Sequence, residues 1–223
     1  MWKLGVEMNG AGDKHRVRKV RSDRKRQIQP VISVEFYDCL ARISFITTTP
    51  IKNVGETLCI EGLRSQKVIH QLSSYFRRDY PFHNDFGDLI LYPGDSTRMP
   101  ITVDRGEGET SRISIRFLQE QHDRLSQLAY SLDLTISSAT TLLLERALYM
   151  DIGLEYIEKH IQSNIDNQRM EQLQEVLLYM NKYQTPDDKI TIPKLVAYLA
   201  KQAYSKTKKV HQYLEEWIDQ FTE

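Results

Sequence analysis

Cysteine is scarce in this chain, and neither sign of charge is in excess. Only Cys39 and Cys59 occur among the 223 residues, both in apolar surroundings and without a CxxC spacing. We therefore expect two buried, reduced thiols rather than a disulfide or a redox pair. The 30 lysines and arginines balance 30 aspartates and glutamates, so any attraction to nucleic acid or to a membrane must be local.

Long apolar runs are missing as well. No stretch approaches the roughly 18 apolar residues that a membrane-spanning helix needs. Residues 1–13 lack the apolar core of a signal peptide. These two absences predict a cytoplasmic protein with no membrane partner.

The common motifs of catalysis and cofactor binding do not occur. The sequence contains no GxxxxGK[ST] phosphate loop, no GxGxxG dinucleotide fingerprint and no GxSxG nucleophile elbow. Its 6 histidines are dispersed, and no two stand at the HxxxH spacing that brings a pair to one helical face. We expect no enzyme activity, no catalytic residue, no metal ligand and no cofactor.

A basic segment lies near the N-terminus. Lysine and arginine fill most of residues 14–26, against the single acid Asp23. Residues 1–30 are predicted to form a flexible basic arm whose cations could lie along DNA phosphates, although a solvated tail or charged strand ends would have the same composition. The phosphate contacts assigned to this arm are Arg18, Lys19, Arg21, Arg24, Lys25 and Arg26.

Residues 31–104 are predicted to form a small α+β domain. Alternating apolar residues over 31–49 favour two strands or a hairpin, and near-helical apolar spacing over 63–78 favours a helix. Short apolar runs at 89–92 and 99–103 predict two more strands. The fold class expected for the whole chain is likewise α+β.

A strand is predicted after a polar, glycine-containing linker that we place at residues 105–111. Polar and apolar residues alternate strictly over 112–117. On a strand this alternation places Arg112, Ser114 and Arg116 together on one face, opposite the apolar residues.

Two helices are predicted to follow this strand. Leucine and alanine recur at helical spacing over 119–132 and again over 138–149. Thr135 or Ser137 could cap the second helix, which begins with small hydroxylated residues. Thr135, Ser137 and Ser138 are therefore candidate phosphate contacts, since the start of a helix presents free amides and a positive dipole end.

A six-residue strand cannot satisfy its own backbone hydrogen bonds and needs a partner strand. If the partner is the same segment of a second chain, an antiparallel ribbon forms at the centre of a homodimer or higher oligomer. An edge strand of the preceding domain is the alternative. The residues predicted to form the dimer core are Ile113, Ile115, Phe117, Leu125, Leu128, Leu142 and Leu143.

The segment 112–150 resembles the ribbon-helix-helix family of DNA-binding proteins, which combine a short alternating strand, a helix, a turn and a second helix. The resemblance covers less than a fifth of the chain. It implies that the outward strand residues contact bases and that the start of the second helix holds a phosphate. Many members carry a glycine at the turn, where this chain has Asp133, a residue type that tolerates the left-handed conformation.

Residues 151–223 are predicted to be a helical C-terminal domain. Apolar residues recur at helical steps, and 9 lysines and arginines stand against 12 aspartates and glutamates. This acidic balance argues against a second DNA surface, so we expect this domain to contact a protein partner.

The function expected from these patterns is sequence-specific binding of double-stranded DNA by a dimeric transcriptional regulator, a repressor of plasmid or phage type. An accessory DNA-binding protein of plasmid partition or conjugative transfer is an alternative, since its DNA-binding unit would look the same. A further alternative is a non-DNA interaction protein or an enzyme whose site lies in residues 31–104.

Overall fold

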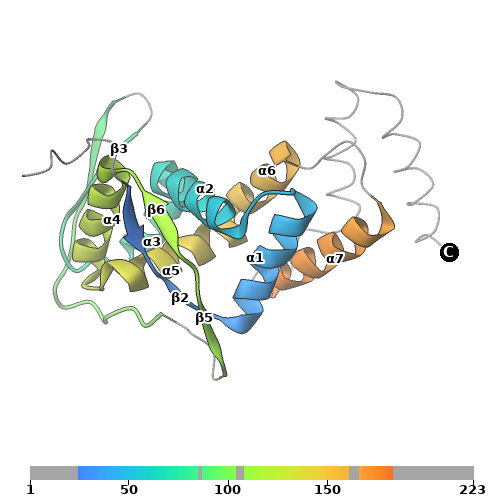
Figure 1. The fold of residues 1–223 in the computed structure, drawn as a ribbon. Coiled ribbons are helices and arrows are strands. Elements are labelled where there is room, and N and C mark those ends of the chain that lie inside the picture. The colour runs from blue at the N-terminus through green and yellow to red at the C-terminus, as the bar shows by residue number, and fades with distance from the viewer. Residues whose placement is uncertain (1–24, 85–86, 104–107, 161–165, 183–223) are drawn as a thin grey trace, which may run out of the picture.

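The computed structural model describes residues 25–84, 87–103, 108–160 and 166–182. Over these ranges the chain has an α+β fold, in which helices predominate and the strands form short antiparallel pairs (Figure 1). The elements in chain order are β1 (Arg26–Ile28), β2 (Val31–Ser33), α1 (Val34–Ile46), α2 (Ile51–Arg64), α3 (Gln66–Ser73), β3 (Tyr80–His83), β4 (Leu89–Tyr92), β5 (Thr110–Arg112), β6 (Ile115–Phe117), α4 (Gln119–Leu132), α5 (Ile136–Tyr149), α6 (Asp151–His160) and α7 (Asn167–Asn181).

A two-stranded antiparallel ribbon joins two distant parts of the chain. β1 pairs with β6 and β2 pairs with β5, and both pairings share one register. We call residues 26–33 and 110–117 together the ribbon. The ladder is interrupted between the two pairings, where Pro30 has no N–H to donate.

The partner of the 112–117 strand is therefore not the one that we expected. A second copy of the chain was predicted to supply it, and instead residues 26–33 of the same chain do so. The backbone N–H and C=O groups that a lone strand leaves unpaired are paired within one molecule. No second chain is therefore needed to complete the ribbon. Residues 26–28, which were assigned to a flexible arm, form β1.

The chain folds as two strand-helix-helix units of the same design. The first unit comprises β1, β2, α1 and α2, and the second comprises β5, β6, α4 and α5. The residues that precede their first helices, Ser33 and Leu118, are 85 positions apart, and so are Pro50 and Thr135 before their second helices. Both short strands of each unit enter the ribbon as one extended segment, which gives the two units an approximate two-fold relation.

The turns between the helices repeat as well. Thr48 in the first unit and Asp133 in the second have φ of 50° and 60°, and they are the positive-φ residues other than glycine in the described part of the chain. They too are 85 positions apart. The left-handed conformation expected for Asp133 is thus confirmed, and its counterpart in the first unit shows that both turns reverse the chain in the same way.

Helix α1 is the main departure from the predicted secondary structure. Two strands or a hairpin were predicted for residues 31–49, but only Val31–Ser33 is a strand. The Ser33 side chain accepts a hydrogen bond from the Phe36 N–H and so caps a helix. The buried residues then follow at helical spacing, which overrides the short alternation around Phe36. They are Phe36, Cys39, Leu40, Ile43 and Ile46.

The core lies where α2 and α5 cross beneath the ribbon. Gly55 of α2 faces the ribbon, since a Cβ built there would lie 2.9 Å from Ile115 Cδ1. Gly62, two turns later, faces α5, where a Cβ would lie 3.1 Å from Leu143 Cδ1 and 3.2 Å from Ala147 Cβ. The absence of a side chain at these two positions lets α2 lie close to the ribbon at Gly55 and close to α5 at Gly62.

We expect Gly62→Leu to lower the free energy of unfolding by about 1–3 kcal/mol, because a side chain there would overpack the contact of α2 with α5. Urea denaturation followed by circular dichroism measures the change. Gly108→Leu is the matched control, since a Cβ at Gly108 would have no atom within 4 Å, and it should leave stability nearly unchanged. Equal destabilisation by both substitutions would contradict the close helix contact.

The segment between the two units forms α3, which packs against α2 and α5, and the β3–β4 hairpin, of which β3 contacts α4 (Figure 1). The strand predicted at 89–92 is confirmed as β4. The helix predicted over 63–78 is confirmed only in part, because α2 ends at Arg64 and α3 ends at Ser73. The strand predicted at 99–103 is wrong, because these residues form no helix or strand.

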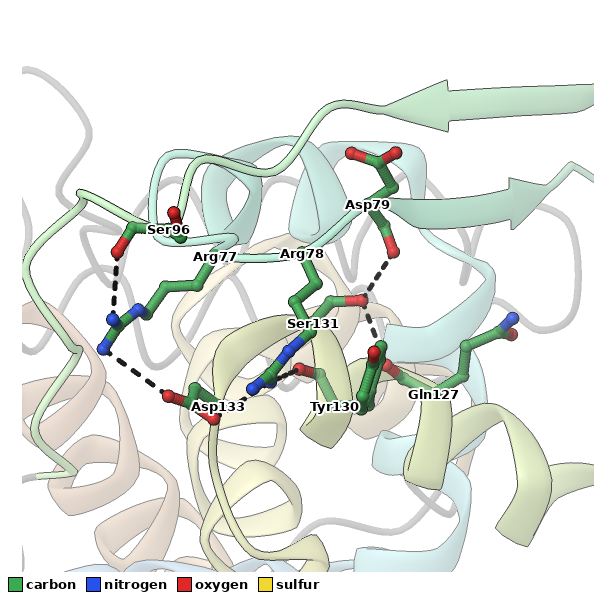
Figure 2. Close-up of polar contacts among 8 residues, drawn as sticks. All are labelled: Arg77, Arg78, Asp79, Ser96, Gln127, Tyr130, Ser131 and Asp133. Carbon is green, nitrogen blue, oxygen red and sulfur yellow. Dashed lines mark hydrogen bonds and ion pairs between the residues drawn. The ribbon is translucent and has the colours of Figure 1, made fainter.

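This connecting segment is held at the end of α4 by two consecutive arginines (Figure 2). The backbone N–H groups of Arg77 and Arg78 donate to the Ser131 carbonyl at 2.8 and 3.2 Å. The Arg78 guanidinium donates to the Tyr130 carbonyl at 2.7 Å and lies 2.9 Å from an Asp133 carboxylate oxygen. These donors satisfy carbonyls that the end of a helix leaves open.

The C-terminal part is helical where it is described, as predicted. α7 packs against α1, where Phe36 and Tyr179 stack with ring centroids 6.0 Å apart. The rest of the predicted helical domain, residues 161–165 and 183–223, lies outside the described residues. Among the helices that the structure describes, none has the length and apolar character required to cross a bilayer.

Both cysteines are buried and free, as predicted. Burial raises the pKa of the Cys39 thiol to about 12, despite the opposing effect of the nearby Arg42, and it also raises the pKa of Cys59. The reactive thiolate is therefore rare in the native protein.

We expect neither cysteine to react readily with iodoacetamide at about pH 8 while the protein is folded, and both to react rapidly in denaturant. Intact-mass spectrometry after timed quenching counts the adducts. Rapid modification of the native protein would contradict the burial of the thiols.

Candidate nucleic-acid interface

The ribbon has one buried and one exposed face. On the strand of the second unit, Ile113, Ile115 and Phe117 are buried, whereas Arg112, Ser114 and Arg116 are exposed. This division agrees with the alternation in the sequence. The three polar residues predicted to read bases thus lie together on an open surface.

The strand of the first unit contributes to the same surface. Ile28, Pro30 and Ile32 are buried, while Gln27 and Gln29 are exposed and Val31 is half-buried. No role was predicted for these outward residues. We call the outward residues of both strands the reading face; they are Gln27, Gln29, Val31, Arg112, Ser114 and Arg116.

The register fixes which residues of the reading face are neighbours. Gln27 lies opposite Arg116, and Val31 lies opposite Arg112. Continuing the same register through the interruption places Gln29 opposite Ser114 at the middle. The face therefore has one arginine at each end and uncharged polar groups at its centre.

The two arginines of the reading face are available for a ligand. Within the described ranges of the chain, the guanidinium groups of Arg112 and Arg116 form no hydrogen bond or ion pair. A guanidinium presents parallel N–H donors that match two acceptors in one plane. The face can thus bind planar pairs of acceptors, such as those on a guanine edge.

Two predicted phosphate contacts at the start of the ribbon already have partners in the protein. Lys25 pairs with Glu56, and the Arg26 Nε donates to the Gln119 side-chain oxygen at 2.6 Å. These contacts tie the start of β1 to α2 and α4. The other predicted contacts of the basic arm, Arg18, Lys19, Arg21 and Arg24, lie outside the described residues.

The start of α5 lies against the middle of the ribbon. Thr135 caps the helix by accepting from the Ser138 N–H at 3.2 Å, and its hydroxyl also donates to the Ser138 Oγ at 2.9 Å. The Ser137 hydroxyl donates to the Gln29 carbonyl at 2.7 Å. These residues, predicted as phosphate contacts, therefore also position the helix start beside the reading face.

The start of α2 is the corresponding position in the first unit. Its preceding residue, Pro50, makes no side-chain cap. Lys52 and Asn53 are exposed in the first turn, at positions equivalent to Ser137 and Ser138. A cation in this place was not predicted, because the sequence analysis did not place a helix start there.

The residues predicted to form a dimer core are buried, but inside a single chain. All seven belong to the hydrophobic core that α2, α4, α5 and the ribbon enclose. They are Ile113, Ile115, Phe117, Leu125, Leu128, Leu142 and Leu143. They share one hydrophobic cluster with apolar residues of the first unit, which takes the place that we had assigned to a second copy.

A signal for the first unit was present in the sequence. Leu40, Ile43 and Ile51 are apolar, as are the residues 85 positions later, Leu125, Leu128 and Ile136. Searching for an internal repeat of this pattern would have revealed the second strand of the ribbon and the reading-face residues Gln27, Gln29 and Val31.

Comparison with known proteins adds no relative to this description. No protein-family model matches the chain, and no curated protein or solved structure is significantly similar to it. Across the described residues, no group of histidine, cysteine, aspartate or glutamate side chains is arranged to hold a metal ion.

Proposed function

We propose that the protein binds double-stranded DNA at specific sequences, by inserting the ribbon into the major groove, and that it regulates transcription. The observation that carries this proposal is the reading face: a two-stranded ribbon with free arginines outward and a hydrophobic core behind it. The arrangement resembles the ribbon-helix-helix proteins, with both units in one chain.

The shape and chemistry of the ribbon suit the major groove. This groove admits a two-stranded ribbon and presents a different pattern of donors and acceptors for each base pair. Arg112 and Arg116 suit the O6 and N7 acceptors of guanine. The amides of Gln27 and Gln29 suit adenine, and Ser114 can donate or accept.

Phosphate contacts at the helix starts would fix the ribbon in the groove. The starts of α2 and α5 are related by the two-fold repeat, so they would approach the backbones on the two sides of the groove. Lys52 adds a positive charge at one of them. Such local contacts are needed because the chain as a whole has no net charge.

The regulatory role rests on the reading face alone, and an accessory role in plasmid partition or conjugative transfer would use the same surface. Binding at a single site over a promoter supports regulation. Cooperative binding along a repeated array supports the accessory role.

Selection of genomic DNA fragments with the purified full chain, at about 150 mM salt, tests the proposal. The wild type should enrich a short recurring motif, and R112A/S114A/R116A should not. The control R64A/K67A removes two exposed positive charges from α2 and α3 and should enrich the same motif as the wild type. Failure of the wild type to enrich any motif would overturn specific DNA binding.

A further inference from the structure

We propose that one chain of this protein recognises a DNA site without two-fold symmetry, in which the two ends are read by different chemistry. This inference rests on the proposed function, since it assumes that the reading face contacts DNA. It adds the symmetry of the site and the number of chains that bind it.

This inference rests on a difference between backbone and side chains. The backbone of the ribbon is approximately two-fold symmetric, but its outward side chains are not. The 85-residue repeat makes Gln27 equivalent to Arg112, Gln29 equivalent to Ser114 and Val31 equivalent to Arg116. None of these pairs is identical. Two identical chains would present the same residue at both members of each pair, and therefore the same contacts to both halves of a site.

The two ends of the ribbon consequently present different groups. At one end Gln27 lies opposite Arg116, which combines an amide with a guanidinium. At the other end Val31 lies opposite Arg112, which combines an isopropyl group with a guanidinium. Arginine favours guanine at both ends, while glutamine favours adenine and an apolar side chain favours the methyl group of thymine.

The backbone contacts differ between the ends as well. The first turn of α2 carries Lys52 and Asn53, where the first turn of α5 carries Ser137 and Ser138. A lysine can neutralise a phosphate, whereas a serine can only donate a hydrogen bond to it. The helix starts therefore favour one orientation of the chain on the DNA.

A small set of exchanges would restore symmetry to the reading face. In V31R/R112Q/S114Q, each strand presents glutamine, glutamine and arginine in the same order. The variant keeps two arginines on the face and the same formal charge as the wild type. All three positions are exposed or half-buried, so the substitutions leave the core of the ribbon untouched.

Selection from a pool of random duplexes compares the site symmetry of the wild type and this variant. We expect the wild type to select a motif without dyad symmetry, and V31R/R112Q/S114Q to select an inverted repeat. Sedimentation of the complex with the wild-type motif should give one chain per site. A wild-type motif that is an inverted repeat, or a site that needs two chains, would overturn the inference while leaving DNA binding intact.

A milder variant covers the case in which the triple exchange impairs folding. V31A should change base preference at one end only, and replacing thymine by uracil at that end should weaken wild-type binding several-fold but hardly affect V31A. Equal effects at both ends would overturn the inference. If the wild type selected no motif at all, the proposed function would fail, and that outcome is distinct from selection of a symmetric motif.

Discussion

Replacing Ile115 by lysine is expected to lower the free energy of unfolding by about 3–5 kcal/mol, a large part of the stability of a domain of this size. The side chain is fully buried in the ribbon and faces Gly55 of α2. An ammonium group there would lose its water without gaining a partner. Urea denaturation followed by circular dichroism measures the loss.

The neighbouring position supplies the control for this experiment. Ser114 precedes Ile115 but points to the exposed face, so Ser114→Lys should unfold at nearly the same urea concentration as the wild type. Because the ribbon forms within one chain, the midpoint for Ile115→Lys should not depend on protein concentration. A concentration-dependent midpoint would indicate that two chains share this core.

Changing Arg116 to alanine is expected to weaken binding to the selected site by about 1–3 kcal/mol, or about 5- to 150-fold, with little change in stability. The guanidinium is exposed and has no partner in the described part of the chain, so its removal breaks no structural contact. Fluorescence anisotropy with labelled duplexes measures the affinity.

Binding to a random duplex distinguishes a base contact by Arg116 from attraction of its charge to the DNA backbone. Arg116→Ala should lose less affinity for a random duplex than for the selected site, and Arg116→Lys, which keeps the charge, should recover little of the specific loss. An equal loss on both duplexes would mean that Arg116 contacts phosphate rather than a base.

The second strand-helix-helix unit could be predicted from the sequence because each of its parts has a strong local pattern. Arg112 to Phe117 alternates strictly, and the bounds predicted for the first helix, 119–132, match α4. The exposed and buried faces of the strand followed directly from the alternation. What one segment could not reveal was its partner, because a strand specifies that it needs a neighbour but not where in the chain the neighbour lies.

The first unit was harder to predict for identifiable physical reasons. Pro30 cannot donate a backbone hydrogen bond and so argues against a strand, and the adjacent basic residues suggested a mobile arm. Alternating apolar residues from Ile32 through Phe36 continued the strand pattern into what is a helix. The cap at Ser33 sets the boundary between β2 and α1. Serine is too common in sequences for this one residue to have predicted the start of the helix.

The covalent connection between the two strands of the ribbon affects how the occupied fraction of a binding site depends on protein concentration. A ribbon formed by two separate subunits dissociates on dilution. The concentration of intact dimer then rises more steeply than in proportion to the total protein concentration. Here the residues between α2 and β5 keep both strands in one molecule. Occupancy of a site by such a chain would follow a simple hyperbola, which allows a few copies in a cell to act without first having to meet.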